Sequence, residues 1–275
     1  LGFEFLEDQD IVINTANSWI ERDHSYKEIF VDGTKHVAFY SHKYGVKRFI
    51  QLGALGSFVD SPAPWLDFKY RAEDMAYAAF PDVTIVRPGI MFGKNATLFN
   101  RILRVFSWFP IVPAPHSLVH VQPVWMDDVV EAIKRLAIEE KDEKVHNTVW
   151  DLGGPQYYQV ADLIRCGLQS SGKRRMVLSN YINTLVWEGI LGITQMLPGA
   201  KVPRDFLVMM KHEWDRTYED GWIVSGHLVE EEGNHTFKDL NMEPKSMEEI
   251  LPTVFSRSVP VSQEAAPEKA SVAKK

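Results

Sequence analysis

The pair Trp65 and Lys69 carries the most informative chemistry in this chain. The two residues lie four apart in a helix predicted over residues 65–80, so both side chains point to one side of that helix. A lysine at this spacing lowers the pKa of a neighbouring hydroxyl through its positive charge, which suits that hydroxyl to acid–base catalysis. Here the neighbour is an indole, whose N–H donates a hydrogen bond but does not titrate near neutral pH. The spacing therefore predicts a binding crevice that lacks its acid and base.

Two alternatives bear on this pair. Tyr70 carries a hydroxyl, but it follows Lys69 by one residue and is turned by about 100° around the helix, so we expect it to point away from the crevice. Trp65 is alternatively an apolar filler at the start of the helix, and that interpretation also leaves the site without an acid. The buried face of the helix is predicted to be a neighbouring one, formed by Phe68, Ala72, Met75 and Ala79.

Short apolar runs alternate with helical patterns along the first 170 residues, which predicts an α/β fold with a parallel sheet covered on both faces. Ligands of such sheets bind outside the carboxyl ends of the strands. The predicted strands are Asp10–Asn14, Val46–Leu52, Val83–Val86 and Val149–Leu152, and the predicted helices are residues 30–44, 65–80, 127–138 and 160–168.

The residues that directly follow the predicted strands are the candidate ligand contacts. Small or polar groups stand there, and glycine lets a ligand approach the backbone closely. Together with the lysine of the helix, the candidate binding residues are Thr15, Ala16, Gly53, Ala54, Lys69, Arg87, Pro88 and Gly89. No residue is assigned a catalytic role.

Composition excludes several classes of protein. The net charge of −7 and the sequence pI near 5.7 argue against nucleic acid as a partner. Cys166 is the single cysteine, so neither an internal disulfide nor a thiolate metal site is expected. Asp127 and Asp128 are predicted to cap a helix rather than to bind a metal. No transmembrane helix is predicted, because no run of 18 or more apolar residues occurs.

We expect three regions along the chain. Residues 1–151 are predicted to form the carboxyl-terminal part of a dinucleotide-binding domain, and residues 152–258 a smaller, mostly helical domain. Residues 259–275 are poor in large apolar side chains and are predicted to be disordered. The most apolar stretch, Tyr181–Leu197, is predicted to be a core helix of the second domain; a surface helix pressed on a membrane or on a partner's apolar groove is the alternative.

Seven short motifs occur in an order that resembles the extended, atypical short-chain dehydrogenase/reductase group. Within that group the chain is most similar to the nucleotide-binding accessory subunits of mitochondrial respiratory complex I, the alpha-subcomplex subunit nine family. Each motif is weak alone, but their order over residues 8–255 is fairly specific. The motifs are DIVINTAN, GVKRFIQLGAL, Lys69 in its helix, VRPGIMFG, VQPVWMDDVVEAI, DLGGPQYY and FKDLNMEPKSMEEIL.

The resemblance implies a Rossmann-like, doubly wound parallel sheet that holds NADPH in a structural role. It further implies a noncatalytic subunit that stabilises the matrix arm of complex I near its membrane junction. The location would be the matrix side of the mitochondrial inner membrane, with other complex I subunits as partners and a peripheral contact with the membrane. The serine or threonine of active members should fall near Gly53 or Ala54, and neither residue carries a hydroxyl.

The sequence departs from the family at its front. No GxxGxxG motif is present, and the chain starts with Leu1 just ahead of what would be the fourth strand of the fold. Lys69, Pro88 and Gly89 would then contact only the nicotinamide end of the dinucleotide. The strand at residues 10–14 would also keep an unpaired edge, which is prone to aggregation. We therefore expect a separate chain, or residues outside this sequence, to supply the phosphate-binding half.

Two other functions stay open at this point. The chain is alternatively an active NAD(P)-dependent reductase or epimerase-like enzyme that acts on a nucleotide sugar or a lipid and uses Tyr70 or a bound water. A third hypothesis is a pseudoenzyme that serves as a regulator or an assembly factor. Turnover by the unaltered protein would favour the enzyme over the structural subunit.

Overall fold

The computed structural model describes residues 2–21, 23–96, 99–100, 103, 110–113, 120–139, 142–173, 175–178 and 234–255. The predicted helix over Tyr181–Leu197 and the predicted tail over residues 259–275 lie outside these residues. Within them, no helix has both the length and the apolar character that crossing a bilayer requires.

The centre of the molecule is a parallel four-stranded sheet with the order β1-β2-β3-β8. Each strand coincides within two residues at either end with a strand predicted from the sequence, because short β-branched and apolar runs between turn residues are typical of buried parallel strands. The strands are β1 (Ile11–Asn14), β2 (Arg48–Leu52), β3 (Thr84–Pro88) and β8 (Thr148–Leu152).

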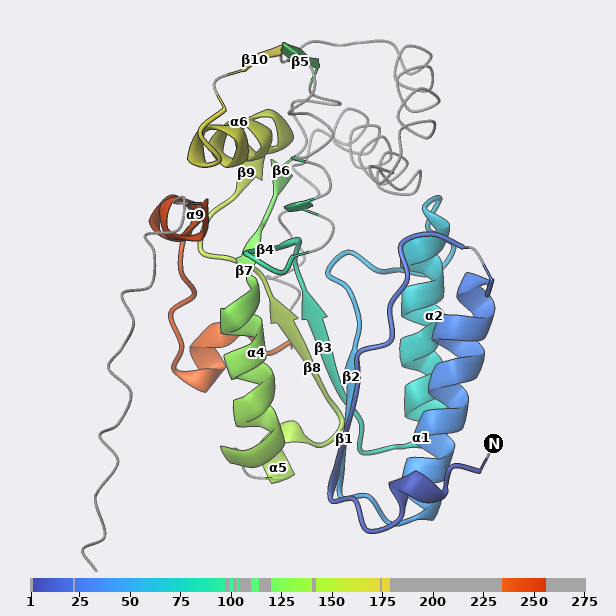
Figure 1. Ribbon diagram of the computed structural model, residues 1–275. Helices are drawn as coiled ribbons and strands as arrows, with labels where there is room; N and C mark the ends of the chain where they lie inside the picture. Colours follow the sequence, from blue (N-terminus) through green and yellow to red (C-terminus); the bar gives the residue numbers. More distant parts are fainter. Residues whose placement is uncertain are drawn as a thin grey trace, which may run out of the picture.

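Helices cover both faces of this sheet (Figure 1). One face carries α1 (Gly33–Lys43), which continues the π-helical segment η2 (Lys27–Asp32), and α2 (Pro64–Ala79). The other face carries α4 (Met126–Lys134), which continues into η3 (Arg135–Glu139). The predicted α/β class with a doubly wound parallel sheet is confirmed.

Alternate strand residues face the two helical layers, as the period of two requires. Phe49 and Ile85 pack towards α1 and α2, whereas Ile50 and Val86 pack towards α4. The buried cluster on the α4 face also contains Phe237 and Leu240 of η5 (Phe237–Leu240), and Trp150 of β8. A segment of the predicted second region thus returns to the sheet, and the boundary at residue 151 stays a prediction.

A second cluster lies beyond the carboxyl end of the sheet. It joins α6 (Val160–Ser170) and α9 (Met247–Phe255) to residues such as Phe92, Phe99 and Val121. The remaining elements are short: η1 (Glu4–Leu6), β4 (Met91–Phe92), β5 (Ile111–Pro113), β6 (His120–Val121), β7 (Val124–Trp125), α5 (Asp142–Val145), β9 (Tyr158–Gln159) and β10 (Met176–Leu178).

Two local predictions meet different outcomes. Gly45 follows α1 with a φ of 76°, a left-handed conformation that suits glycine as the residue ending a helix, as predicted. The predicted aspartate cap of α4 is wrong, because Trp125 occupies the cap position and makes no side-chain cap bond. Asp128 lies inside the first turn instead, and its carboxylate accepts a hydrogen bond from the backbone N–H of Lys245 at 2.7 Å.

The edge position of β1 bears on function. Within the described part of the chain, β1 pairs with β2 and with no other strand. Ile11 packs partly on the α4 face, and Ile13, two residues on, shares that face but is 42% exposed. An apolar parallel strand thus presents an open edge and one uncovered isoleucine.

Candidate functional site

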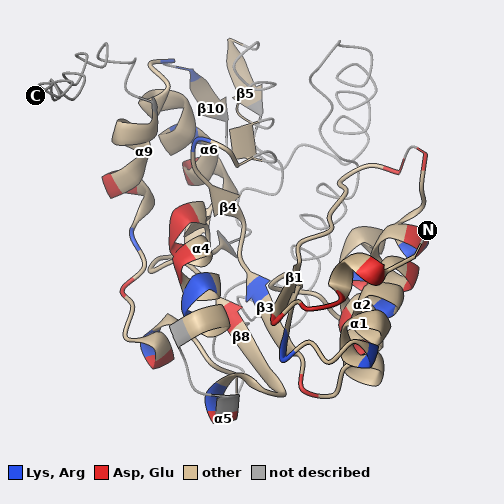
Figure 2. Cartoon of the chain, turned by 60° about the horizontal axis from the view of Figure 1, so that its bottom comes forward, with Lys and Arg blue, Asp and Glu red and all other residues tan. Residues whose placement is uncertain are grey.

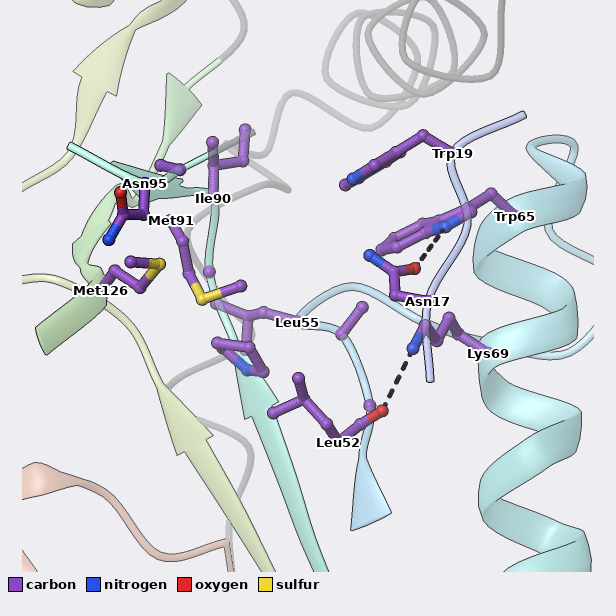
Figure 3. A pocket seen from close by; sticks show the side chains of 15 residues that line it. Asn17, Trp19, Leu52, Leu55, Trp65, Lys69, Ile90, Met91, Asn95 and Met126 are labelled. Atoms are coloured by element: carbon purple, nitrogen blue, oxygen red, sulfur yellow. Dashed lines mark hydrogen bonds between the residues drawn. The ribbon is translucent and has the colours of Figure 1, made fainter. Parts of the chain in front are cut away.

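A cavity of about 180 Å³ lies at the carboxyl ends of β2 and β3, between the first turns of α2 and the segment that leads into β4 (Figure 3). Its wall is mostly apolar, and this volume is below the roughly 300–1,000 Å³ of typical ligand pockets. The space suits one ring-sized group rather than a whole dinucleotide. The lining residues are Asn17, Trp19, Leu52, Gly53, Ala54, Leu55, Trp65, Lys69, Pro88, Gly89, Ile90, Met91, Asn95, Ala96 and Met126.

Five of the eight predicted binding residues come together in this wall: Gly53, Ala54, Lys69, Pro88 and Gly89. Thr15 and Ala16 do not line the cavity, but the backbone carbonyl of Ala16 accepts a hydrogen bond from Lys69 at 3.2 Å. The side chain of Arg87 is held elsewhere by an ion pair, and Tyr70 is absent from the wall. A cofactor contact by Thr15, Ala16 or Arg87 stays a prediction.

Lys69 is the buried cation of the site, with 1% of its surface exposed. Its Nζ donates to the carbonyls of Ala16 and Leu52, both at 3.2 Å, which ties α2 to the ends of β1 and β2. The ammonium also lies 4.7 Å from the ring centre of Phe30 and 5.8 Å from that of Trp65. Burial lowers the pKa of Lys69 to about 8, and the negative charge of Glu73 opposes part of this drop.

Trp65 lies beside Lys69 in the cavity wall and is held by the loop after β1. Its indole N–H donates to Asn17 Oδ1 at 3.2 Å, and its ring stacks on Trp19 with the centres 4.0 Å apart. Both partners come from the loop after β1. The indole is therefore fully engaged with protein groups.

The face of α2 that is most buried differs from the predicted one. Trp65, Lys69, Ala72 and Ala76 are buried, whereas Phe68 is only partly buried. The pair was expected on a face beside the buried stripe, and it lies in the stripe itself. An amphipathic pattern does not predict a buried lysine, because lysine is almost never fully buried in proteins. Lys69 is therefore more deeply buried than the pattern indicates.

Directly behind the cavity lies an ion pair that the sequence analysis missed. Arg87 donates to Glu73 Oε2 through Nε at 3.0 Å and Nη2 at 2.7 Å, and the Ser57 hydroxyl lies 3.3 Å from Glu73 Oε1. Glu73 is 2% exposed. Burial raises the pKa of Glu73, and the positive charge of Arg87 opposes that rise. A signal was available, because Glu73 follows Lys69 by one helical turn and so faces the same side.

Gly53 owes its identity to this ion pair. A Cβ atom at Gly53 would lie 2.1 Å from Glu73 Oε1, so a side chain there would displace the carboxylate. Asp151 of β8, in register with Arg87 of β3, adds a second buried carboxylate beside it. Figure 2 shows basic ribbon on β3 close to acidic ribbon on β8.

The cavity wall carries few polar groups. Within the described residues, no group of three or more histidine, cysteine, aspartate or glutamate side chains could hold a metal ion. The polar groups of the wall are one ammonium, the amides of Asn17 and Asn95, the indole N–H groups of Trp19 and Trp65, and backbone atoms. Such a wall orients a ring and its polar substituents.

The depressed pKa of Lys69 makes a prediction for stability. In the unfolded chain the lysine titrates near 10.5 and in the folded chain near 8, so between these values the unfolded state binds more protons. Stability therefore rises with pH in this window, and the burial penalty is fully present below pH 8. Lys69→Met lacks this penalty. Between pH 7.5 and 9.5, we expect the native chain to gain about 2 kcal/mol relative to Lys69→Met in urea unfolding. An unchanged difference would contradict the buried, charged lysine.

The architecture is a Rossmann-like fold. The NADPH-dependent quinone oxidoreductase of Escherichia coli superposes with a TM-score of 0.65 at 14% identity, covering 91% of this chain and 78% of the other. A nucleoside-diphosphate-sugar epimerase of Staphylococcus aureus superposes with a TM-score of 0.62 at 14% identity, covering 90% and 78%. At these identities the likeness establishes the fold alone. No protein-family profile matches the sequence.

The sequence relatives are subunits of respiratory complex I. The mitochondrial 40 kDa subunit of NADH-ubiquinone oxidoreductase from Neurospora crassa is 24% identical over 242 residues, or 88% of this chain and 59% of that protein. The mitochondrial alpha subcomplex subunit 9 of NADH dehydrogenase (ubiquinone) 1 from Rattus norvegicus is 29% identical over 164 residues, or 58% and 42%. The Dictyostelium discoideum protein of the same name is 25% identical over 246 residues, or 88% and 63%. These relatives are thus named either alpha subcomplex subunit 9 or the 40 kDa subunit, and this chain spans 42% to 63% of the length of the three.

Proposed function

We propose that this chain is a noncatalytic accessory subunit of mitochondrial complex I, on the matrix side of the inner membrane, that stabilises the matrix arm near the membrane junction. The similarity to complex I subunits over 88% of the chain supports the assembly. The observation that carries the noncatalytic role is Trp65, whose N–H is bound to Asn17 where an active site of this fold would need a titratable hydroxyl.

Depletion of the chain tests the role. We expect loss of the assembled complex, accumulation of partial assemblies on native gels and a matching fall in NADH oxidation. A Lys69→Met chain that no longer retains a nucleotide should still restore some assembly, because Lys69 is 1% exposed and offers no surface to a neighbouring subunit. A fully assembled and active complex in depleted cells would contradict the proposal.

We further propose that the cavity holds the nicotinamide end of NADPH. The chemistry of the cavity supports this proposal, because the space is ring-sized and mostly apolar. Its one buried ammonium could donate to hydroxyl or carbonyl oxygens of the ligand. The backbone at Pro88 and Gly89 lets a ligand approach closely. Bound NADPH would supply a hydride donor, and the residues here would only bind and orient it. The remaining dinucleotide needs a phosphate-binding half that these 275 residues do not contain.

The open edge of β1 is where that half would pair. We propose that it is carried by a separate polypeptide whose strand adds to β1 and whose next helix covers Ile13. The support is the apolar character of β1, its single partner β2 within the described residues, and the 42% exposure of Ile13. Residues continuous with this chain would satisfy the same edge, and intact-mass measurement of the native polypeptide distinguishes the two sources.

Substitution at the edge gives a direct prediction. Ile13→Lys places a charge where the exposed 42% of an isoleucine is to be buried, which forfeits about 1 kcal/mol of apolar burial and adds the cost of burying an ammonium. We expect recovery of the chain in the assembly to fall about tenfold or more, as measured by quantitative mass spectrometry of the native complex. Met176→Lys is the matched control, because Met176 is 63% exposed and lies on β10, in a different sheet. Equal recovery of both variants would refute pairing at β1.

A further inference from the structure

Trp19 spans the crevice in a way that the predicted site did not include. It follows β1 by five residues and packs against two clusters. One contains Phe30 and Trp65 on the α2 side, and the other contains Phe92 and Ala96 on the opposite side. Figure 3 shows Trp19 above Trp65, with Met91 and Met126 across the cavity. A single side chain thus bridges both walls.

The stack is anchored by several contacts. The Trp19 and Trp65 rings are nearly parallel, 12° apart with centres at 4.0 Å, and the edge of Phe30 backs Trp65 at 6.5 Å. Asn17 Oδ1 accepts the Trp65 N–H, and the hydroxyl of Tyr26 donates to the carbonyl of Trp19 at 3.1 Å. Hydrogen bonds therefore hold the loop after β1 at Asn17 and at Trp19, and stacking on Trp65 holds the Trp19 ring in place.

The stacked Trp19 ring and Asn17 occupy the surfaces of Trp65 on which a planar ligand would bind. One face of Trp65 is covered by Trp19, and the indole N–H is bound to Asn17. What is left is the space of about 180 Å³ beside Lys69 and Pro88. A planar molecule that stacks on Trp65 must first displace the Trp19 ring.

We propose that Trp19 is a built-in occupant of a planar-aromatic binding site in front of Trp65, and that it closes the substrate half of the crevice. The inference deepens the proposed function and rests on it only in naming this space the substrate half. While the Trp19 ring occupies this space, no hydride-accepting substrate can bind beside a dinucleotide in the cavity. The chain would thus leave its bound cofactor unreacted because it excludes substrates, and also because it lacks an acid.

Removal of the ring should expose the site. Trp19→Gly leaves an apolar hole of indole size, and engineered apolar cavities of about 150 Å³ are known to bind small aromatic molecules. We expect millimolar indole to raise the Tm of Trp19→Gly by about 2–4 °C more than it raises the Tm of the native chain, because any binding in the cavity beside Lys69 is common to both. Trp19→Phe is the matched control, because its ring still covers Trp65, and indole should affect it no more than it affects the native chain.

Three results would overturn the proposal. Indole could stabilise the native chain as much as Trp19→Gly, which would mean that the site is already open. A folded Trp19→Gly that binds no indole would show that the loop collapses onto Trp65. Indole could also stabilise Trp19→Phe as much as Trp19→Gly, which would place the indole site elsewhere. None of these readouts involves complex I or NADPH, so the proposed function is tested separately.

A second variant keeps the test informative if Trp19→Gly does not fold. Asn17→Ala retains both rings and removes the hydrogen bond to the Trp65 N–H. In NMR of the chain with labelled indole nitrogens, we expect that N–H to exchange with water at least about fivefold faster in Asn17→Ala, since one hydrogen bond contributes about 1 kcal/mol or more. An unchanged exchange rate would contradict the anchored stack.

Discussion

Arg87→Met lowers the free energy of unfolding by about 3–5 kcal/mol, because it leaves the carboxylate of Glu73 buried without its cation. Glu73 is 2% exposed and cannot regain water without opening the packing of α2 on the strand ends. The loss should be smaller at pH 5 than at pH 8. Burial already raises the pKa of Glu73, and without Arg87 the carboxyl protonates more readily. Urea unfolding at the two pH values measures both effects.

The matched control for this variant is Arg71→Met. Arg71 also bridges carboxylates, those of Asp60 and Asp67, but its side chain is 44% exposed. Exposed ion pairs contribute little, so its denaturation midpoint should stay close to that of the native chain. Equal losses in the two variants would show that the buried pair has no special weight. In that case the predicted contact of Arg87 with a cofactor would be the better explanation of this residue.

Lys69→Met separates binding from stability. Lys69 is the one buried cation of the cavity wall, and a hydrogen bond from a charged donor contributes about 1.5–3 kcal/mol. Affinity for NADPH should therefore fall about 10- to 100-fold. Stability near pH 7 should stay equal or rise, because methionine replaces a buried charge with an apolar chain of similar length. Nucleotide released from the purified variant assembly and its Tm are the two measurements.

Lys47→Met is the control for charge alone. Lys47 pairs with Asp10 on the surface, and its side chain is 78% exposed. The substitution removes the same charge at a distance from the cavity, so NADPH retention should not change. Retention by Lys69→Met equal to that of Lys47→Met would contradict nucleotide binding at this cavity.

The strands and the crevice could be predicted because they depend on local patterns. Apolar runs of four to six residues ending in Thr15, Gly53 or Gly89 mark buried parallel strands and the rim where ligands bind. The Trp65 and Lys69 spacing placed both residues in the cavity wall. These inferences need only the helical period and the rule that parallel strands end at one edge.

The parts that were missed depend on contacts between distant segments. Trp19 reaches Trp65 across 46 positions of sequence, counted from their numbers, and nothing in the loop after β1 indicates that partner. Arg87 follows the predicted strand Val83–Val86, which predicts a ligand contact, yet Glu73 on the facing helix binds its guanidinium. The predicted aspartate cap is wrong because α4 begins at Met126, ahead of both aspartates, and Asp128 accepts instead from the distant backbone N–H of Lys245.

Native purification tests the central claim most directly. Respiratory membranes solubilised in mild detergent are separated by native electrophoresis, and the band that holds this chain is analysed by mass spectrometry for polypeptides and for nucleotide released on denaturation. We predict co-migration with complex I subunits, a polypeptide carrying the phosphate-binding half, and NADPH in a one-to-one ratio with the chain. A free protein without those companions, or one that oxidises NADPH with a carbonyl substrate, would contradict the account.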